Sequence, residues 1–308
     1  MEHKRQANYE YKRRKMNTSE TKNDNEACPL DAIVIGLNDT GKIFNENCLE
    51  TMSRMEDNFI DLTVTSPPYE NLRTYNGNID ETWGEDVWKP IIKELYRVTK
   101  EGGVVVWVVG DATINGSETG TSFKQALWAM ECGFNLHDTM IYKKDGSPFP
   151  DKARYFQCFE YMFVMSKGTP KNINLISDRR NYWDISKSSS TRSKNGKTTN
   201  KKNDVIRKNK NGVRFNIWDI NNGYMKSSKD IVSFQHPASF PESLAKDHIK
   251  SWSNEGDLVY DPFMGSGTTA KMAHLLKRKW LGSEISKEYV ELAEKRLEPY
   301  LRQGTLAL

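Results

Sequence analysis

Residues 261–269, DPFMGSGTT, decide the fold predicted for this chain. They stand between a short apolar segment at 257–260 and a helical pattern at 268–277. Because Gly265 and Gly267 have no Cβ, the backbone there can approach a ligand closely, and the helix that follows begins with free N–H groups. A strand, a glycine turn and a helix in this order predict a ligand-binding loop at the carboxyl end of a strand in an α/β fold.

Strands and helices alternate along most of the remaining chain. Strands are predicted at 60–64, 104–109, 136–142, 159–165 and 280–284, and helices at 85–100, 121–132, 241–252 and 287–301. In the first of these helices Val87, Ile91 and Leu95 share one face. This alternation predicts a Rossmann-like, mostly parallel sheet with helices on both faces.

A glycine loop of this kind can serve three kinds of ligand. The stretch from Gly265 to Ala270 fits the dinucleotide fingerprint GxGxxA, and Glu284, 19 residues after Gly265, would hold a ribose. A P-loop is excluded because no lysine follows Gly267. S-adenosylmethionine has a cationic sulfonium and amino group and no pyrophosphate, so it suits an aspartate before the glycines. Asp261 occupies that position, which favours S-adenosylmethionine over a dinucleotide.

A second motif, TSPPY at 65–69, follows the predicted strand at 60–64. Its two prolines fix φ and remove two N–H donors, which leaves a stiff loop with carbonyl oxygens and the Ser66 hydroxyl as acceptors. The exocyclic amine of a base is a poor nucleophile because its lone pair is delocalised into the ring. Hydrogen bonds from the amine to Ser66 Oγ and the Pro67 carbonyl would direct the lone pair at a methyl donor, while Tyr69 stacks on a flipped base. The alternative is an ordinary rigid loop.

Between residues 178 and 230 the chain becomes strongly basic. The segment contains 14 Lys and Arg against five Asp, a formal balance of +9. Aromatic residues are interspersed, which favours a nucleic-acid surface over a solvated loop. The aromatic residues are Tyr182, Trp183, Phe215, Trp218 and Tyr224. The cations expected to contact DNA are Arg179, Arg180, Lys201, Lys202, Arg207 and Lys208. The polar residues 1–30 carry a cationic run at 12–15, which predicts a flexible tail or a basic arm on DNA.

The composition of the 308 residues excludes several classes of protein. The longest purely apolar run, 104–109, is too short to span a bilayer, and the basic N-terminus has no apolar signal segment. The four cysteines are scattered without a CxxC pair or a Cys/His cluster, so we expect no metal and a reducing, cytoplasmic environment.

TSPPY at 65–69 together with DPFMGSGTT at 261–269 resembles the amino-methyltransferases of DNA, which modify N4 of cytosine or N6 of adenine. The catalytic motif precedes the cofactor motif with a basic insertion between them, an order similar to that of the β group of this family. Supporting similarities occur at 103–111, 160–168, 236–244 and 282–296. The resemblance covers residues 42–170 and 215–300.

The resemblance implies a class I S-adenosylmethionine-dependent methyltransferase fold that acts on double-stranded DNA. The catalytic loop would comprise Ser66, Pro67, Pro68 and Tyr69. The cofactor pocket would comprise Asp261, Phe263, Gly265, Gly267, Thr268, Glu284 and Phe240. The chain would divide into a tail at 1–30, a catalytic half at 31–170, a target-recognition insertion at 171–233 and a cofactor-binding half at 234–308. In a bacterial or phage restriction–modification system, a restriction endonuclease acting on the same site would be a partner. Neither a membrane nor a metal is expected, and the sequence carries no signal for an oligomeric state.

Ser66 stands where many adenine enzymes of this family carry Asp, so the resemblance favours cytosine N4, with adenine N6 as the alternative. C5 methylation needs a thiolate, commonly from a Pro-Cys pair, and the comparable residues Cys28 and Pro29 are reversed and lie in the polar tail. Three other functions stay open: a dinucleotide-dependent oxidoreductase, a catalytically silent DNA-binding protein, and a methyltransferase of RNA or protein. Binding of S-adenosylmethionine against NAD would test the first of these.

Overall fold

The structure is a computed structural model of the chain. It describes residues 34–68, 83–146, 153–181, 185–187, 191–199, 204–206, 210–236 and 239–303. The tail predicted at 1–30 lies outside the described residues, as do Tyr69, Lys201, Lys202, Arg207 and Lys208. Among the described helices, none combines the length and the apolar composition needed to cross a bilayer.

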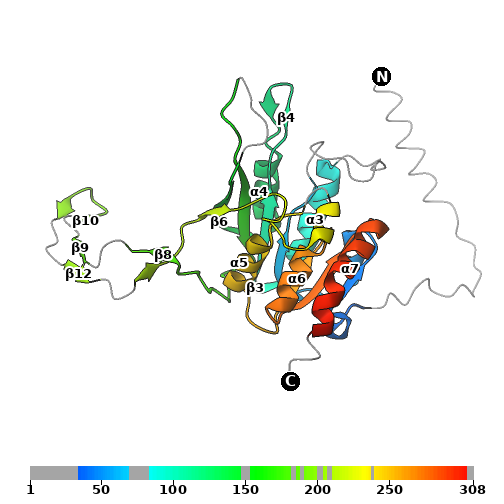
Figure 1. Ribbon diagram of the computed structural model, residues 1–308. Helices are drawn as coiled ribbons and strands as arrows, with labels where there is room; N and C mark the ends of the chain where they lie inside the picture. The colour runs from blue at the N-terminus through cyan, green and yellow to red at the C-terminus, as the bar shows by residue number, and fades with distance from the viewer. Residues whose placement is uncertain are drawn as a thin grey trace, which may run out of the picture. The chain divides into compact units, whose positions relative to one another are not determined.

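An eight-stranded sheet organises the described chain, with the strand order β1-β16-β15-β2-β3-β7-β6-β14 (Figure 1). Its strands are β1 (Lys42–Phe44), β2 (Ile60–Thr65), β3 (Thr99–Val109), β6 (Asn135–Lys144), β7 (Phe159–Ser166), β14 (Ile217–Ile220), β15 (Leu258–Asp261) and β16 (Lys279–Ser283). All neighbours pair in parallel except β7, which is antiparallel to both β3 and β6. This confirms the predicted mostly parallel, Rossmann-like sheet.

Helices cover both faces of the sheet. Along β3, the even-numbered residues from Val104 to Val108 belong to one buried cluster, and the odd-numbered residues from Val105 to Val109 belong to another. The first cluster includes side chains of α5 (Glu242–Trp252), α6 (Thr268–Leu275) and α7 (Lys287–Gln303), which lie side by side in Figure 1. The second includes side chains of α2 (Cys48–Ser53), α3 (Glu85–Val98) and α4 (Thr121–Cys132).

Each predicted strand and helix is present, with changes at the ends. Helix α3 ends at Val98 rather than at residue 100, because Thr99 is already extended (φ −72°, ψ 132°) and pairs with Ile60 at the start of β3. Strand β1, helix α2 and strand β14 were not predicted. The first two are short, three and six residues, so neither shows a clear period.

Strand β14 lies inside the segment predicted as an insertion at 171–233, yet it pairs with β6 in the main sheet. Its burial alternates, with Trp218 and Ile220 buried, so the end of this segment belongs to the core. The remainder forms three antiparallel strand pairs that are nested in the sequence. These are β8 (Arg179–Arg180) with β13 (Asn211–Gly212), β9 (Ile185–Lys187) with β12 (Asp204–Ile206), and β10 (Thr191–Arg192) with β11 (Thr198–Thr199). A separate short pair, β4 (Thr113–Ile114) with β5 (Ser117–Glu118), follows β3.

Candidate active site

The two sequence motifs meet at the carboxyl ends of β15 and β2, which are neighbours in the sheet. From β15 the chain passes through α6 to β16 on one side, whereas from β2 it passes through α3 to β3 on the other. In an open α/β sheet, ligands bind in the crevice where the connections diverge in this way. The Ser66 loop follows β2 and the Asp261 loop follows β15, so the structure places both predicted motifs at this crevice.

A buried hydrogen bond joins the two motifs directly. Thr65 Oγ1 donates to Asp261 Oδ1 at 2.6 Å, and the Phe263 N–H donates to the same oxygen at 3.0 Å. Thr269, at the start of α6, donates from Oγ1 to the Val64 carbonyl at 3.0 Å. These bonds hold the loop after β2 and the loop after β15 in one arrangement. Thr65 belongs to the TSPPY motif, but its partner could not be identified without the pairing of β2 with β15.

Asp261 is almost completely buried, with 1% of its surface exposed. Burial raises its pKa to about 6, although hydrogen bonds with the hydroxyls of Thr65 and Thr269 and with the Phe263 N–H favour the charged form. All three of these partners are neutral dipoles. A cationic group of a ligand placed beside Asp261 would therefore stabilise the carboxylate further.

The turn between β15 and α6 requires glycine at two positions. Gly265 (φ +50°) and Gly267 (φ +77°) have left-handed backbone conformations. A Cβ on Gly267 would lie 3.1 Å from Ala293 Cβ, and one on Gly265 would lie 3.0 Å from His236 Nε2. His236 thus covers the glycine turn, a position that the sequence indicated only through the segment 236–244.

Glu284 follows β16 and fastens the same turn. Its Oε2 accepts the Gly265 N–H at 2.8 Å and its Oε1 accepts the Ser286 N–H at 2.9 Å, while Asn45 Nδ2 donates to the Glu284 carbonyl at 2.9 Å. Burial raises the pKa of Glu284, and the two backbone N–H donors oppose that effect. Each carboxylate oxygen keeps acceptor capacity for a ligand hydroxyl.

The remaining predicted cofactor residues have different surroundings. The Phe263 ring packs edge-on against Trp83 (5.4 Å between ring centroids) and Trp107 (6.0 Å), which makes an apolar wall beside Asp261. Phe240 is partly buried against the cluster that includes α5, α6 and α7. Thr268 is buried, and its Oγ1 accepts a hydrogen bond from Arg296 at 3.0 Å, so this side chain has a role within the protein.

The described part of the predicted catalytic loop, residues 66–68, is only partly exposed. Pro67 is buried, and Ser66 and Pro68 are partly buried. Ser66 directly follows Thr65, which is bonded to Asp261. The acceptors predicted for an amine therefore lie at the crevice where the cofactor loop begins.

The basic segment contains both exposed and structural cations. Arg180 is exposed, whereas Arg179 donates to the Val213 carbonyl at 2.9 Å and lies 4.6 Å from the centre of the Phe215 ring. Arg214, which contributes to the +9 balance, forms ion pairs with Asp178 and Asp247.

The aromatic residues of this segment divide in the same way. Phe215 and Tyr224 are 66% and 67% exposed, but Trp218 is buried and stacks on His248. Of the described aromatic residues in this segment, Phe215 and Tyr224 therefore stay candidates for contact with bases, whereas Trp218 packs in the core. In the described part of the chain, no group of three or more His, Cys, Asp or Glu side chains is placed to hold a metal ion.

Comparison with known proteins agrees with the fold and the motifs. A family model described as DNA methylase, covering N6 and N4 methyltransferases, matches residues 60–295. The orphan methyltransferase M.BamHII of Bacillus amyloliquefaciens is 60% identical over 249 residues, which cover 79% of this chain and 90% of the relative. The DNA adenine methyltransferase YhdJ of Escherichia coli K12 is 28% identical over 268 residues, covering 85% of this chain and 84% of YhdJ.

Solved structures share the fold. The cytosine-N4-specific PvuII DNA methyltransferase superimposes with a TM-score of 0.61 at 22% identity, covering 85% of this chain and 92% of that chain. The complex of M1.HpyAVI with S-adenosylmethionine superimposes with a TM-score of 0.54 at 20% identity, covering 83% of this chain and 98% of that chain. The chain therefore belongs to the N6/N4 DNA methylase family, a family of S-adenosylmethionine-dependent DNA methyltransferases, as its two motifs predicted.

Proposed function

We propose that this protein methylates the exocyclic N4 of a flipped-out cytosine in double-stranded DNA. The observation that carries the proposal is the Thr65–Asp261 hydrogen bond, because it brings an acceptor loop for an amine beside a buried carboxylate suited to a cationic methyl donor. A dinucleotide would gain nothing from a buried acid at this position, so the oxidoreductase alternative is rejected.

Each residue of the site has a part in this proposal. Asp261 would face the cationic portion of S-adenosylmethionine, Glu284 would accept from its ribose hydroxyls with the carboxylate that holds the Gly265 N–H, and the glycine turn would allow close backbone approach. When bound, the cofactor supplies an electrophilic methyl group. Ser66 Oγ and the Pro67 carbonyl accept hydrogen bonds from the amine, which keeps the nitrogen lone pair off the ring and aims it at that methyl. Transfer would be direct, without a covalent intermediate on the enzyme: the nitrogen lone pair would form the bond to the methyl carbon as the carbon–sulfur bond breaks, S-adenosylhomocysteine would leave, and the methylated amine would lose one proton to solvent.

The choice of cytosine depends on Ser66. Relatives and structural neighbours include a protein named as an adenine methyltransferase and one named as cytosine-N4-specific. Adenine N6 is the alternative product. A stiff loop with a neutral hydroxyl in place of an aspartate favours cytosine.

One experiment identifies the methylated base. Wild-type protein is incubated with tritiated S-adenosylmethionine and, in parallel reactions, with unmethylated plasmid DNA, RNA or protein as acceptor, and the nucleosides of the digested DNA are separated. We expect label in N4-methylcytosine; label in N6-methyladenine would select the alternative, and label only in RNA or protein acceptors would reject DNA as substrate.

The role of the loop is tested with Ser66→Ala. This variant should lower turnover by roughly 100-fold, within the range found when one positioned polar group is removed from an active site. Its affinity for S-adenosylmethionine should change little. Ser117→Ala, a substitution of an exposed serine, is the matched control. Turnover of Ser66→Ala equal to that of the control would reject the role of Ser66.

We further propose that the segment 171–233, apart from strand β14, recognises the target DNA in the cytoplasm of a bacterium or phage-infected cell. The exposed Arg180 and Phe215 and the nested strand pairs support this role. The relative M.BamHII is called an orphan, so the proposal does not require a paired restriction endonuclease.

A further inference from the structure

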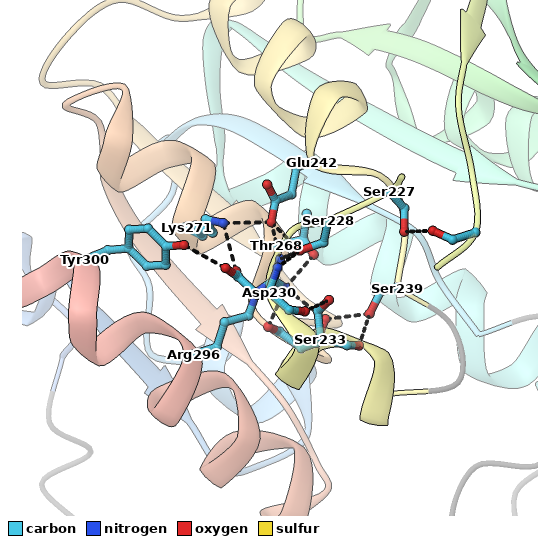
Figure 2. A network of polar contacts seen from close by, with 12 residues as sticks. Ser227, Ser228, Asp230, Ser233, Ser239, Glu242, Thr268, Lys271, Arg296 and Tyr300 are labelled. Atoms are coloured by element: carbon cyan, nitrogen blue, oxygen red, sulfur yellow. Dashed lines mark hydrogen bonds and ion pairs between the residues drawn. The ribbon is translucent and has the colours of Figure 1, made fainter. Parts of the chain in front are cut away.

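A buried cluster of charged side chains lies between the glycine turn and the segment that leads from β14 to α5 (Figure 2). Its charged members are Asp230, Glu242, Lys271 and Arg296. Arg296, on α7, is 3% exposed and forms hydrogen bonds with five residues: Ser228, Asp230, Glu242, Ser266 and Thr268. The sequence indicated Arg296 only as one residue of a helix that matched the family.

Two nitrogens of the Arg296 guanidinium donate hydrogen bonds to the two carboxylates. Nε donates to Asp230 Oδ2 at 2.8 Å, and Nη2 donates to Glu242 Oε1 at 2.7 Å. Lys271 Nζ contacts the same two oxygens at 2.8 Å each, so two cations balance two carboxylates. Burial acts to raise the pKa of Asp230, but hydrogen bonds from Arg296, Lys271 and Tyr300 hold it at about 2.

The third nitrogen of the guanidinium, Nη1, contacts the glycine turn. Nη1 donates to the Ser266 carbonyl at 2.9 Å, lies 3.2 Å from Ser266 Oγ, and donates to Thr268 Oγ1 at 3.0 Å. Ser266 Oγ also lies 2.6 Å from Ser239 Oγ. A guanidinium presents five donors in one plane and can reach both sides at once, which the single ammonium of lysine cannot do.

Stability alone is a weak reason for this arrangement. Buried ion pairs can often be replaced by apolar side chains without loss of stability. The turn, however, has glycine at 265 and 267 in left-handed conformations and therefore lacks side chains at those positions that could hold its shape. Besides the bond from the Gly267 N–H to the Met264 carbonyl within the turn, hydrogen bonds with Glu284 and Arg296 outside it hold the direction of its backbone groups.

We propose that Arg296 is a positioning residue for methyl transfer, which holds the 264–268 turn in the shape that binds the cofactor. Asp230 and Glu242 orient the guanidinium, and both come from the segment that follows β14. The inference rests on the proposed function, since it takes the turn to be the binding loop for S-adenosylmethionine. It also makes the shape of that loop depend on the chain leading out of the basic segment.

The test compares Arg296→Lys with Arg302→Lys, a control on the same helix whose arginine forms an exposed ion pair with Glu298. Three quantities are measured: the Kd of S-adenosylhomocysteine by calorimetry, the Tm without ligand, and kcat and KM for S-adenosylmethionine on unmethylated plasmid DNA. Lysine keeps the charge beside the acids but loses the contacts with the turn. We expect Arg296→Lys to raise Kd and KM roughly tenfold or more, with a Tm close to wild type. The control should match wild type in all three.

Two results would overturn the inference. One is a folded Arg296→Lys variant with unchanged Kd and KM; the other is a lowered Tm with unchanged Kd below the melting transition, which would leave Arg296 a purely structural role. If Arg296→Lys does not fold, Asp230→Asn tests the same link from outside the turn, and an unchanged Kd there also overturns it. Wild-type protein that binds no S-adenosylhomocysteine would instead reject the proposed function, and this inference with it.

Discussion

Replacing Asp261 with asparagine should stabilise the protein without ligand and abolish its response to the cofactor. Asp261 is buried at the carboxyl end of β15, and burial raises its pKa to about 6 from the ordinary 3.8. The asparagine Oδ1 can still accept from the Thr65 hydroxyl and the Phe263 N–H, and its NH2 group can donate to the Thr269 hydroxyl. The substitution therefore removes a charge without removing the local hydrogen bonds.

The size of the effect follows from the two pKa values. Each pH unit between the folded and unfolded values is worth 1.36 kcal/mol, so ionised Asp261 lowers the free energy of unfolding by about 3 kcal/mol above pH 6. Because the folded pKa is the higher one, this penalty is absent below about pH 3.8 and develops as the pH rises to about 6. The advantage of Asp261→Asn should thus reach up to about 3 kcal/mol at pH 8 and shrink at pH 4.5.

Urea denaturation of both proteins without ligand, at several pH values from 4.5 to 8, measures this difference. Asp57→Asn is the control, since Asp57 is exposed. Thermal unfolding at pH 8 with S-adenosylhomocysteine should then raise the Tm of the wild type but not that of Asp261→Asn. A variant no more stable than wild type at pH 8, or an advantage that does not change with pH, would refute the assignment of a buried, destabilising carboxylate.

Three further predictions concern other parts of the molecule. His248 is buried on α5, and burial lowers its pKa to about 3, so its contribution to stability is present above pH 6.5 and is lost as the pH falls. His248→Leu should therefore flatten the decline in unfolding free energy between pH 6.5 and 4.5. An unchanged slope would contradict this. Gly282→Ala would place a Cβ 3.1 Å from Met264 Cγ and 3.2 Å from Met264 Cβ, beneath a buried side chain, and should cost about 1–3 kcal/mol by chemical denaturation, whereas Gly146→Ala, with open space around it, should not. DNA binding should weaken steeply with salt, and Arg180→Gln should reduce the slope of log K against log salt by about 1; a flat salt response would remove the basic segment from DNA recognition.

Periodicity and the two motifs predicted the class of fold and the family, and both predictions are confirmed. Strand and helix periods are local, and so is the need for glycine at Gly265 and Gly267, whose left-handed conformations the structure contains. The predictions were most accurate where a residue type has a single structural role, as glycine has in a left-handed turn. The predictions were weaker where a residue type can have several roles. Trp218 lies in the basic segment, which suggested contact with DNA bases, but its side chain is buried in the core.

Which side chains form hydrogen bonds with each other depends on how the strands and helices pack. Thr65 and Asp261 are 196 positions apart, and they bond because β2 pairs with β15 rather than with another strand. Arg296 likewise reaches Asp230 and the Ser266 carbonyl only after α7 packs beside α6 and the segment before α5. Local periodicity specifies elements but not their neighbours, because the energy of a buried polar contact depends on partners that the fold brings together.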